Sequence, residues 1–239
     1  MQTLRSFVNF LFFGLWTAFM VSLAVTLGVL TRDPGLFRRM QRHWASGLCR
    51  FWGVELQVFG AEHMPSDRSY VVMSNHLSYV DIVVLFIALP VIPGFLAKRE
   101  LTRVPFLGQA LRSGGHVVID RNKHASAMQT INDAAEQVRD GKTVLIFPEG
   151  TRGDSATIGS FKKGGFHLAK SAQVPILPVG IRGARDIFPR GSILVRPGKI
   201  EVHIGESFAP ELIADRTPGE MIPMVRERVM ELSAMPSRS

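Results

Sequence analysis

The apolar and polar positions near the N-terminus separate into two stretches, and the first is an unbroken apolar run. Residues 6–31 contain no charged side chain. As a helix they would extend about 39 Å, compared with roughly 30 Å for the hydrocarbon core of a bilayer. A secretory signal has a shorter apolar core and a small-residue cleavage site, and no such site follows here. The pattern therefore predicts a retained membrane segment. Gly14 and Gly28 leave open whether it spans the bilayer or bends back into one leaflet.

The second stretch, residues 36–52, alternates apolar and basic positions at helical spacing. Its apolar positions are Leu36, Phe37, Met40, Trp44, Leu48, Phe51 and Trp52. An amphipathic, arginine-rich helix that bears tryptophan is typical of the membrane interface. The alternative is a helix packed on the domain that follows it. We assign residues 1–52 to membrane-attachment helices.

From residue 53 to residue 239 the pattern changes to short apolar runs that alternate with helical or glycine-marked stretches. Strands are predicted at residues 54–59, 70–74, 94–97, 116–120, 143–147, 176–181, 193–195 and 201–204. Helices are predicted at residues 124–139, with a stop at Gly141, and at residues 218–232. The alternation predicts one α/β domain with a mixed sheet covered by helices.

Composition and charge narrow the class of partner. The formal net charge is +8, which favours an acidic partner. The basic residues are scattered, and no pattern of a nucleic-acid-binding motif is present, so we expect no nucleic acid. They are dense only after the apolar run, at Arg32, Arg38, Arg39, Arg42 and Arg50. This density predicts contact with lipid headgroups, and it places the rest of the chain on the cytoplasmic side of a membrane. The single cysteine excludes an intramolecular disulfide.

His76 and Asp81 form a His-x4-Asp pattern directly after the predicted strand at residues 70–74. Asp81 also has a structural interpretation, because Ser78 and Asp81 fit a capping box that opens a helix. The two interpretations are compatible, since a carboxylate near a helix start can accept the ring N–H of a histidine in the preceding loop. An imidazole held in this way presents its other nitrogen as a base at neutral pH. We predict His76 as the base and Asp81 as its orienting partner.

Nothing near this pair resembles the nucleophile elbow of a serine hydrolase, so the nucleophile is expected to be a hydroxyl of the substrate. A donor for the oxyanion is not defined by the sequence. The backbone at the start of the helix that follows Asn75 is one candidate.

Glu149, Gly150, Thr151 and Arg152 follow the apolar strand predicted at residues 143–147. Functional groups of α/β domains gather at the carboxyl ends of strands. The planar guanidinium of Arg152 matches a phosphate, and the backbone of Gly150 and the hydroxyl of Thr151 add donors. An ordinary turn with a salt bridge explains the string equally well when it is taken alone.

Further basic residues end other predicted strands or follow the Glu149 loop. Arg121 follows one strand, Lys98 and Arg99 end another, and Lys162 comes shortly after the loop. A second arginine at a second strand end favours a shared anion site over isolated solvated caps. Residues 174–181 contain no reactive group, and we expect a buried strand there.

Four motifs, in this order, resemble the 1-acyl-sn-glycerol-3-phosphate acyltransferase family over about residues 70–182. They are the Asn-His-x4-Asp block at 75–81, the Lys-x-Glu-Leu block at 98–101 leading through Pro105 and Gly108 to Arg121, the Phe-Pro-Glu-Gly-Thr-Arg block at 147–152 with Lys162, and the Val-Pro-Ile-Leu-Pro-Val block at 174–179.

The resemblance implies direct transfer of a fatty acyl group from acyl-CoA or acyl-carrier protein, as co-substrate, to the 2-hydroxyl of lysophosphatidic acid, forming phosphatidic acid. His76 and Asp81 would be catalytic, with no cofactor and no metal. Residues 174–181 would help to shape the acyl pocket, and the N-terminal helices would sit among membrane lipid. The substrate-binding residues would be Asn75, Lys98, Arg121, Glu149, Gly150, Thr151, Arg152 and Lys162.

Two alternatives stay open at this point. One is an acyltransferase for another lysolipid acceptor, such as lyso-ornithine lipid, which would make little use of Arg121 and Arg152. The other is a non-catalytic membrane lipid-binding protein, which gives no reason for His76 and Asp81 beside an anion loop.

Overall fold

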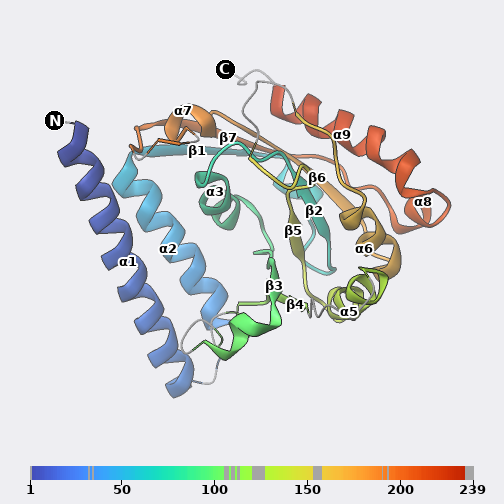
Figure 1. The fold of residues 1–239 in the computed structure, drawn as a ribbon, viewed down its shortest axis with the longest axis horizontal. Helices are drawn as coiled ribbons and strands as arrows, with labels where there is room; N and C mark the ends of the chain where they lie inside the picture. The colour runs from blue at the N-terminus through green and yellow to red at the C-terminus, as the bar shows by residue number, and fades with distance from the viewer. Residues whose placement is uncertain are drawn as a thin grey trace.

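A mixed five-stranded sheet runs through the protein in the order β1-β7-β6-β2-β5 (Figure 1). The computed structural model describes residues 2–31, 33, 35–104, 108, 111, 114–119, 127–152, 158–189, 191–192 and 194–234. The strands of the sheet are β1 (Val54–Phe59), β2 (Val71–Ser74), β5 (Val144–Ile146), β6 (Ile176–Arg182) and β7 (Gly198–Ile204). A smaller sheet pairs β3 (Leu96–Lys98) with β4 (Val117–Ile119).

The strand directions place the loops after β2 and β5 at one edge of the sheet. Strand β2 pairs in parallel with both β5 and β6, β1 pairs in parallel with β7, and β6 pairs with β7 in antiparallel. The predicted mixed sheet is therefore confirmed. Because neighbouring parallel strands end at the same edge, the segments that contain His76 and Glu149 lie side by side.

Helices cover both faces of the sheet (Figure 1). They are α1 (Gln2–Thr31), α2 (Leu36–Trp52), α3 (Val80–Ala88), α5 (Ala127–Arg139), α6 (Gly164–Ala172), α7 (Ala184–Ile187), α8 (Pro210–Ala214) and α9 (Pro218–Ala234), with 3₁₀ turns η1 (Ala61–His63) and η2 (Arg99–Arg103). Alternate residues of β2 enter different cores: Val72 packs with α2 and α3, whereas Val71 packs with α5, α6 and α9.

Two tryptophan side chains form hydrogen bonds between helices α1 and α2. The indole of Trp16 donates to the Trp44 carbonyl at 3.0 Å, and the indole of Trp44 donates to the Thr17 hydroxyl at 3.1 Å. Gly47 is required at the crossing, because a Cβ there would lie 2.5 Å from the Trp16 ring. Helix α2 also buries Leu48 in the core with α3. The alternative of a helix packed on the catalytic domain is thus confirmed for this face of α2.

Helix α1 presents large apolar side chains to its surroundings. Phe7, Leu15 and Leu30 are 63%, 63% and 74% exposed. Within the described residues, only the segment Ser6–Gly28 is long and apolar enough to cross a membrane, with a mean hydropathy of 2.0. Such an exposed apolar surface supports the predicted membrane association.

One predicted element is wrong. Leu194 and Val195 form no strand, and residue 193 lies outside the described residues. The Ser192 hydroxyl accepts the Leu194 N–H at 3.0 Å, and the Arg196 N–H donates to the Ile187 carbonyl at 2.8 Å. These bonds use the backbone locally, and the apolar pattern reflects burial of Val195 in the core.

Residues 124–126 of the predicted helix lie outside the described residues, and the rest forms α5. The division at residue 52 stays a prediction.

Candidate active site

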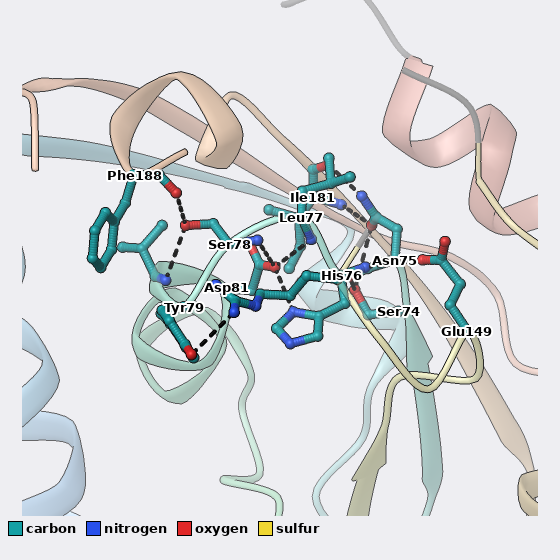
Figure 2. A network of polar contacts seen from close by, with 12 residues as sticks. Ser74, Asn75, His76, Leu77, Ser78, Tyr79, Asp81, Glu149, Ile181 and Phe188 are labelled. Atoms are coloured by element: carbon teal, nitrogen blue, oxygen red, sulfur yellow. Dashed lines mark hydrogen bonds and ion pairs between the residues drawn. The ribbon is translucent and has the colours of Figure 1, made fainter. Parts of the chain in front are cut away.

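The imidazole of His76 and the carboxylate of Asp81 are in direct contact at the carboxyl end of β2 (Figure 2). His76 Nδ1 lies 2.8 Å from Asp81 Oδ2, and the same oxygen accepts the backbone N–H groups of Leu77 and Ser78, each at 2.8 Å. Donation of the Nδ1 hydrogen to the carboxylate leaves Nε2 with its lone pair. The His76 side chain is 14% exposed, so the ring is mostly buried but still open to solvent.

Asp81 combines this role with that of a helix start, as expected, with one difference. Helix α3 begins at Val80, and the Ser78 hydroxyl accepts the Val80 N–H at 3.3 Å and donates to the Phe188 carbonyl at 2.7 Å. Only the carboxylate half of the predicted capping box is therefore present. Burial raises the pKa of the Asp81 carboxyl, while the N–H donors at Oδ2 oppose that shift because they stabilise the ionised form.

Asn75 holds the loop before His76 against the neighbouring strand. Its side-chain oxygen accepts the Ile181 N–H at 2.8 Å, and its side-chain nitrogen donates to the Ile181 carbonyl at 2.9 Å. The amide thereby pairs with both backbone polar groups of Ile181 near the end of β6. Since both ends of the buried amide are used, the structure places Asn75 as a support of His76, and its predicted substrate contact stays a prediction.

The loop after β5 completes the surroundings of His76. The Phe147 ring stacks on the imidazole with centroids 3.9 Å apart. Glu149 Oε1 accepts the His76 N–H at 3.2 Å, and Glu149 Oε2 accepts the Gly159 N–H at 2.8 Å. The carboxylate thus bridges two backbone segments. This geometry assigns Glu149 to the support of the loop and leaves its direct contact with substrate as a prediction.

Gly150 and Lys162 lie against each other beyond Glu149. Gly150 adopts a left-handed conformation, with φ of 74°, and a Cβ there would lie 2.4 Å from the Lys162 ammonium. The Lys162 side chain crosses this glycine, and the Lys162 N–H donates to the Pro148 carbonyl at 2.8 Å. A side chain at position 150 would meet this lysine. Lys162 is exposed and therefore accessible to an anionic ligand.

Arg152 points to the helix that carries Asp81. Its guanidinium lies 3.7 Å from the centre of the Tyr79 ring and donates to the Tyr79 hydroxyl at 3.0 Å. Thr151, the residue before it, is exposed. Two other predicted ligands cannot be placed: Arg121 lies outside the described residues, and so does the side chain of Lys98, whose backbone ends β3.

An apolar groove of about 620 Å³ opens beside Tyr79 and Arg152. Its walls come from α1, α2, α3 and the segment after α7, including Phe10, Phe13 and Phe188. Residues 174–181 do not line it, because β6 is buried in the sheet. The expectation that this run shapes the pocket is therefore not met for this groove. The apolar pattern of the run reflects a central strand.

The structure removes three backbone groups before α3 from the candidate oxyanion donors. The N–H of His76 is used by Glu149, and those of Leu77 and Ser78 are used by Asp81. These backbone groups are therefore not free for an oxyanion.

Cys49 offers no thiolate nucleophile, since burial raises its pKa to about 11. In the part of the chain that is described, no cluster of His, Cys, Asp or Glu is arranged to hold a metal ion.

Sequence reasoning missed Phe147 and Tyr79 as parts of the site. The sequence pattern places Phe147 at the end of a predicted strand, and Tyr79 among the unspecified positions between His76 and Asp81. Their positions inside two chemistry-bearing strings were the only available signal. Their partners are distant in the sequence, as with Tyr79 and Arg152, which are separated by 73 positions.

Comparison with known proteins agrees with this geometry. A family model described as Acyltransferase matches residues 55–182, which include both loops of the site. The fold and this family match thus define an acyltransferase.

The chain belongs to the 1-acyl-sn-glycerol-3-phosphate acyltransferase family. It is 30% identical to the human 1-acyl-sn-glycerol-3-phosphate acyltransferase alpha, over 93% of this chain and 82% of that protein. It is 33% identical to the 1-acyl-sn-glycerol-3-phosphate acyltransferase of Saccharomyces cerevisiae, over 75% of this chain and 60% of that protein. The crystal structure of the 1-acyl-sn-glycerophosphate (LPA) acyltransferase PlsC from Thermotoga maritima matches with a TM-score of 0.83 and 26% identity, over 100% of both chains.

Proposed function

We propose that this enzyme transfers a fatty acyl group from a thioester, acyl-CoA or acyl-carrier protein, to the 2-hydroxyl of 1-acyl-glycerol-3-phosphate, forming phosphatidic acid. The contact between His76 Nδ1 and Asp81 Oδ2, at 2.8 Å, carries the proposal because it leaves Nε2 as a fixed base. The names of the relatives, which include acyltransferases of this acceptor, support the choice of acceptor.

In the proposed reaction His76 Nε2 takes the proton of the acceptor hydroxyl, and the alkoxide attacks the thioester carbonyl. This attack forms the C–O bond of the new ester, and the C–S bond breaks when the tetrahedral intermediate collapses. The thiolate leaves as CoA or carrier-protein thiol after it receives the proton from the imidazolium. Since the thioester is already reactive, alignment and a base account for most of the required catalysis.

A panel of acceptors tests this function. Purified enzyme is incubated with one thioester donor and with lysophosphatidic acid, lyso-ornithine lipid, another lysophospholipid or no acceptor. The lipid products are identified by mass spectrometry. We expect phosphatidic acid as the main product. Faster transfer to lyso-ornithine lipid would reassign the acceptor, and liposome binding without loss of the thioester would identify a non-catalytic lipid-binding protein.

Arg152 is proposed to bind the acceptor phosphate, together with Lys162 and Arg121. Because a charge-assisted hydrogen bond contributes about 1.5–3 kcal/mol, Arg152→Met should raise the KM for lysophosphatidic acid roughly 10- to 100-fold, with a smaller loss of kcat. Arg152→Lys should recover part of the affinity. Steady-state kinetics at varied acceptor concentration measure both constants.

The matched control for Arg152 is an acceptor that lacks the phosphate. Wild type and Arg152→Met should use 1-acylglycerol equally poorly. An unchanged KM for lysophosphatidic acid in Arg152→Met would exclude Arg152 as a phosphate ligand.

We further propose that α1 holds the enzyme in a membrane with the catalytic domain on the cytoplasmic side. The exposed apolar side chains of α1 and the arginines after it support this arrangement. Cys49 is buried, so a cysteine placed at the exposed Glu211 gives a selective label. A membrane-impermeant thiol reagent should label Glu211→Cys in inside-out vesicles only. Labelling in right-side-out vesicles would reverse the orientation.

A further inference from the structure

Arg226 lies on α9, outside residues 55–182 that the acyltransferase family model matches. Its guanidinium nevertheless reaches the segment beside the active-site loop. Arg226 Nε donates to the Gly159 carbonyl at 2.9 Å, and a terminal nitrogen donates to the Ile158 carbonyl. Two adjacent carbonyls are thus held by one rigid, permanently charged fork.

The same short segment holds the carboxylate of Glu149. The Gly159 N–H donates to Glu149 Oε2 at 2.8 Å, and Glu149 Oε1 accepts the His76 N–H at 3.2 Å. A continuous path of hydrogen bonds therefore runs from Arg226 through Gly159 and Glu149 to the backbone of His76. Figure 2 shows the last step, with Glu149 beside the His76 loop.

The path has a mechanical consequence for Glu149. Gly159 is exposed, so packing alone does not fix the direction of its N–H. With both neighbouring carbonyls held by Arg226, this N–H points at Glu149 Oε2. A Cβ at Gly159 would lie 3.2 Å from Oε2, which shows how closely the two residues approach. Without Arg226, one of the two bonds that orient the carboxylate is weakened.

The orientation of Glu149 matters because His76 is a fixed base. The Asp81 contact sets the direction of the imidazole ring, whereas the Glu149 contact sets the backbone from which the ring extends. A displacement of about 1 Å at a catalytic group can lower the rate about 100-fold. Arg152, the proposed phosphate ligand, donates instead to the Tyr79 hydroxyl.

We propose that Arg226 is a positioning residue, which acts through Gly159 and Glu149 to hold His76 in its catalytic place. The inference rests on the proposed function of His76 as the base. It assigns part of the alignment of the site to a helix beyond the four sequence motifs. Its expected signature is a lower kcat with little change in the KM for the acceptor.

Kinetics of matched variants test the proposal. We expect Arg226→Met to lower kcat about tenfold while the KM for lysophosphatidic acid changes less than about twofold, and Arg226→Lys to recover part of the loss. Arg228, on the same helix and paired with Glu231 at 2.9 Å, provides the control, and Arg228→Met should keep the wild-type kcat. An equal effect of Arg226→Met and Arg228→Met would overturn the proposal.

The dependence on Glu149 is tested by a double variant. If Arg226 acts through Glu149, Arg226→Met combined with Glu149→Gln should have a kcat close to that of Glu149→Gln alone. Independent, multiplying losses would contradict the path. This comparison separates a positioning role from a general loss of stability, because two unrelated destabilising changes add their effects.

Amide hydrogen exchange of the full-length enzyme tests the path without activity. In Arg226→Met, peptides that contain Gly159 and His76 should exchange faster than in wild type, and in Arg228→Met they should not. Wild-type exchange at His76 in Arg226→Met would overturn the inference even if transfer is observed. Absence of transfer by the wild type would instead reject the proposed function.

Discussion

Replacement of His76 by alanine should lower kcat for acyl transfer by about 10²- to 10⁴-fold, the range over which general bases contribute. Alanine removes the imidazole that Asp81 orients and that stacks on Phe147. The acceptor should still bind, since its proposed phosphate ligands are untouched. Thiol release from the donor, followed at saturating acceptor, measures the loss.

The control for His76→Ala is an equivalent change at an exposed histidine. His43 lies on α2 and is exposed, so His43→Ala should transfer at the wild-type rate. Membrane binding and the thermal unfolding midpoint of His76→Ala should stay near those of wild type. Near-normal turnover in His76→Ala would remove the imidazole from the mechanism.

Replacement of Asp81 should separate activity from stability, depending on the new residue. Asp81→Ala leaves the buried N–H groups of Leu77 and Ser78 without their acceptor. Each such group costs about 1–3 kcal/mol, so the loss of their acceptor should lower the free energy of unfolding by roughly 2–6 kcal/mol. Transfer should fall about as far as in His76→Ala, because the ring is no longer oriented.

Asp81→Asn keeps an oxygen acceptor and removes the buried charge. Because burial raises the pKa of Asp81, the ionised carboxylate opposes folding at neutral pH, and the amide does not carry that cost. We expect a loss of stability of about 1 kcal/mol or less, together with a large loss of kcat. Chemical denaturation and steady-state kinetics of the two variants make the comparison. Equal stability of Asp81→Ala and wild type would reject the role in the helix start.

Most elements of the fold could be predicted because their patterns are local. The apolar spacing predicts a helix at residues 36–52, and α2 ends at Trp52, where Gly53 adopts a left-handed conformation that stops it. Strand β1 also matches its prediction. The strand predicted at residues 193–195 is wrong because a buried apolar residue such as Val195 gives the same sequence pattern in a loop as in a strand.

In the candidate site, too, the sequence predicts the contacts between residues that are close in the chain and not those between distant residues. His76 and Asp81 are close in sequence and flank a helix start, so their contact follows from local geometry. The contact of Glu149 with the His76 backbone joins positions 73 residues apart, and that of Arg226 with Gly159 joins positions 67 apart. Such contacts depend on the order of strands in the sheet and on the packing of α9. Neither can be predicted from the local pattern of apolar and polar residues.

The central claim is that His76 drives direct transfer from the thioester to the hydroxyl of lysophosphatidic acid. A single-turnover experiment tests it most directly: excess enzyme is mixed with a labelled acyl thioester, with and without lysophosphatidic acid, and thiol release, lipid product and intact protein mass are followed together. The account predicts that wild type releases thiol only with the acceptor, in step with phosphatidic acid and with no acylated protein, and that His76→Ala releases almost none. Thiol release without acceptor accompanied by an acyl adduct on the protein, or an undiminished burst in His76→Ala, would contradict it.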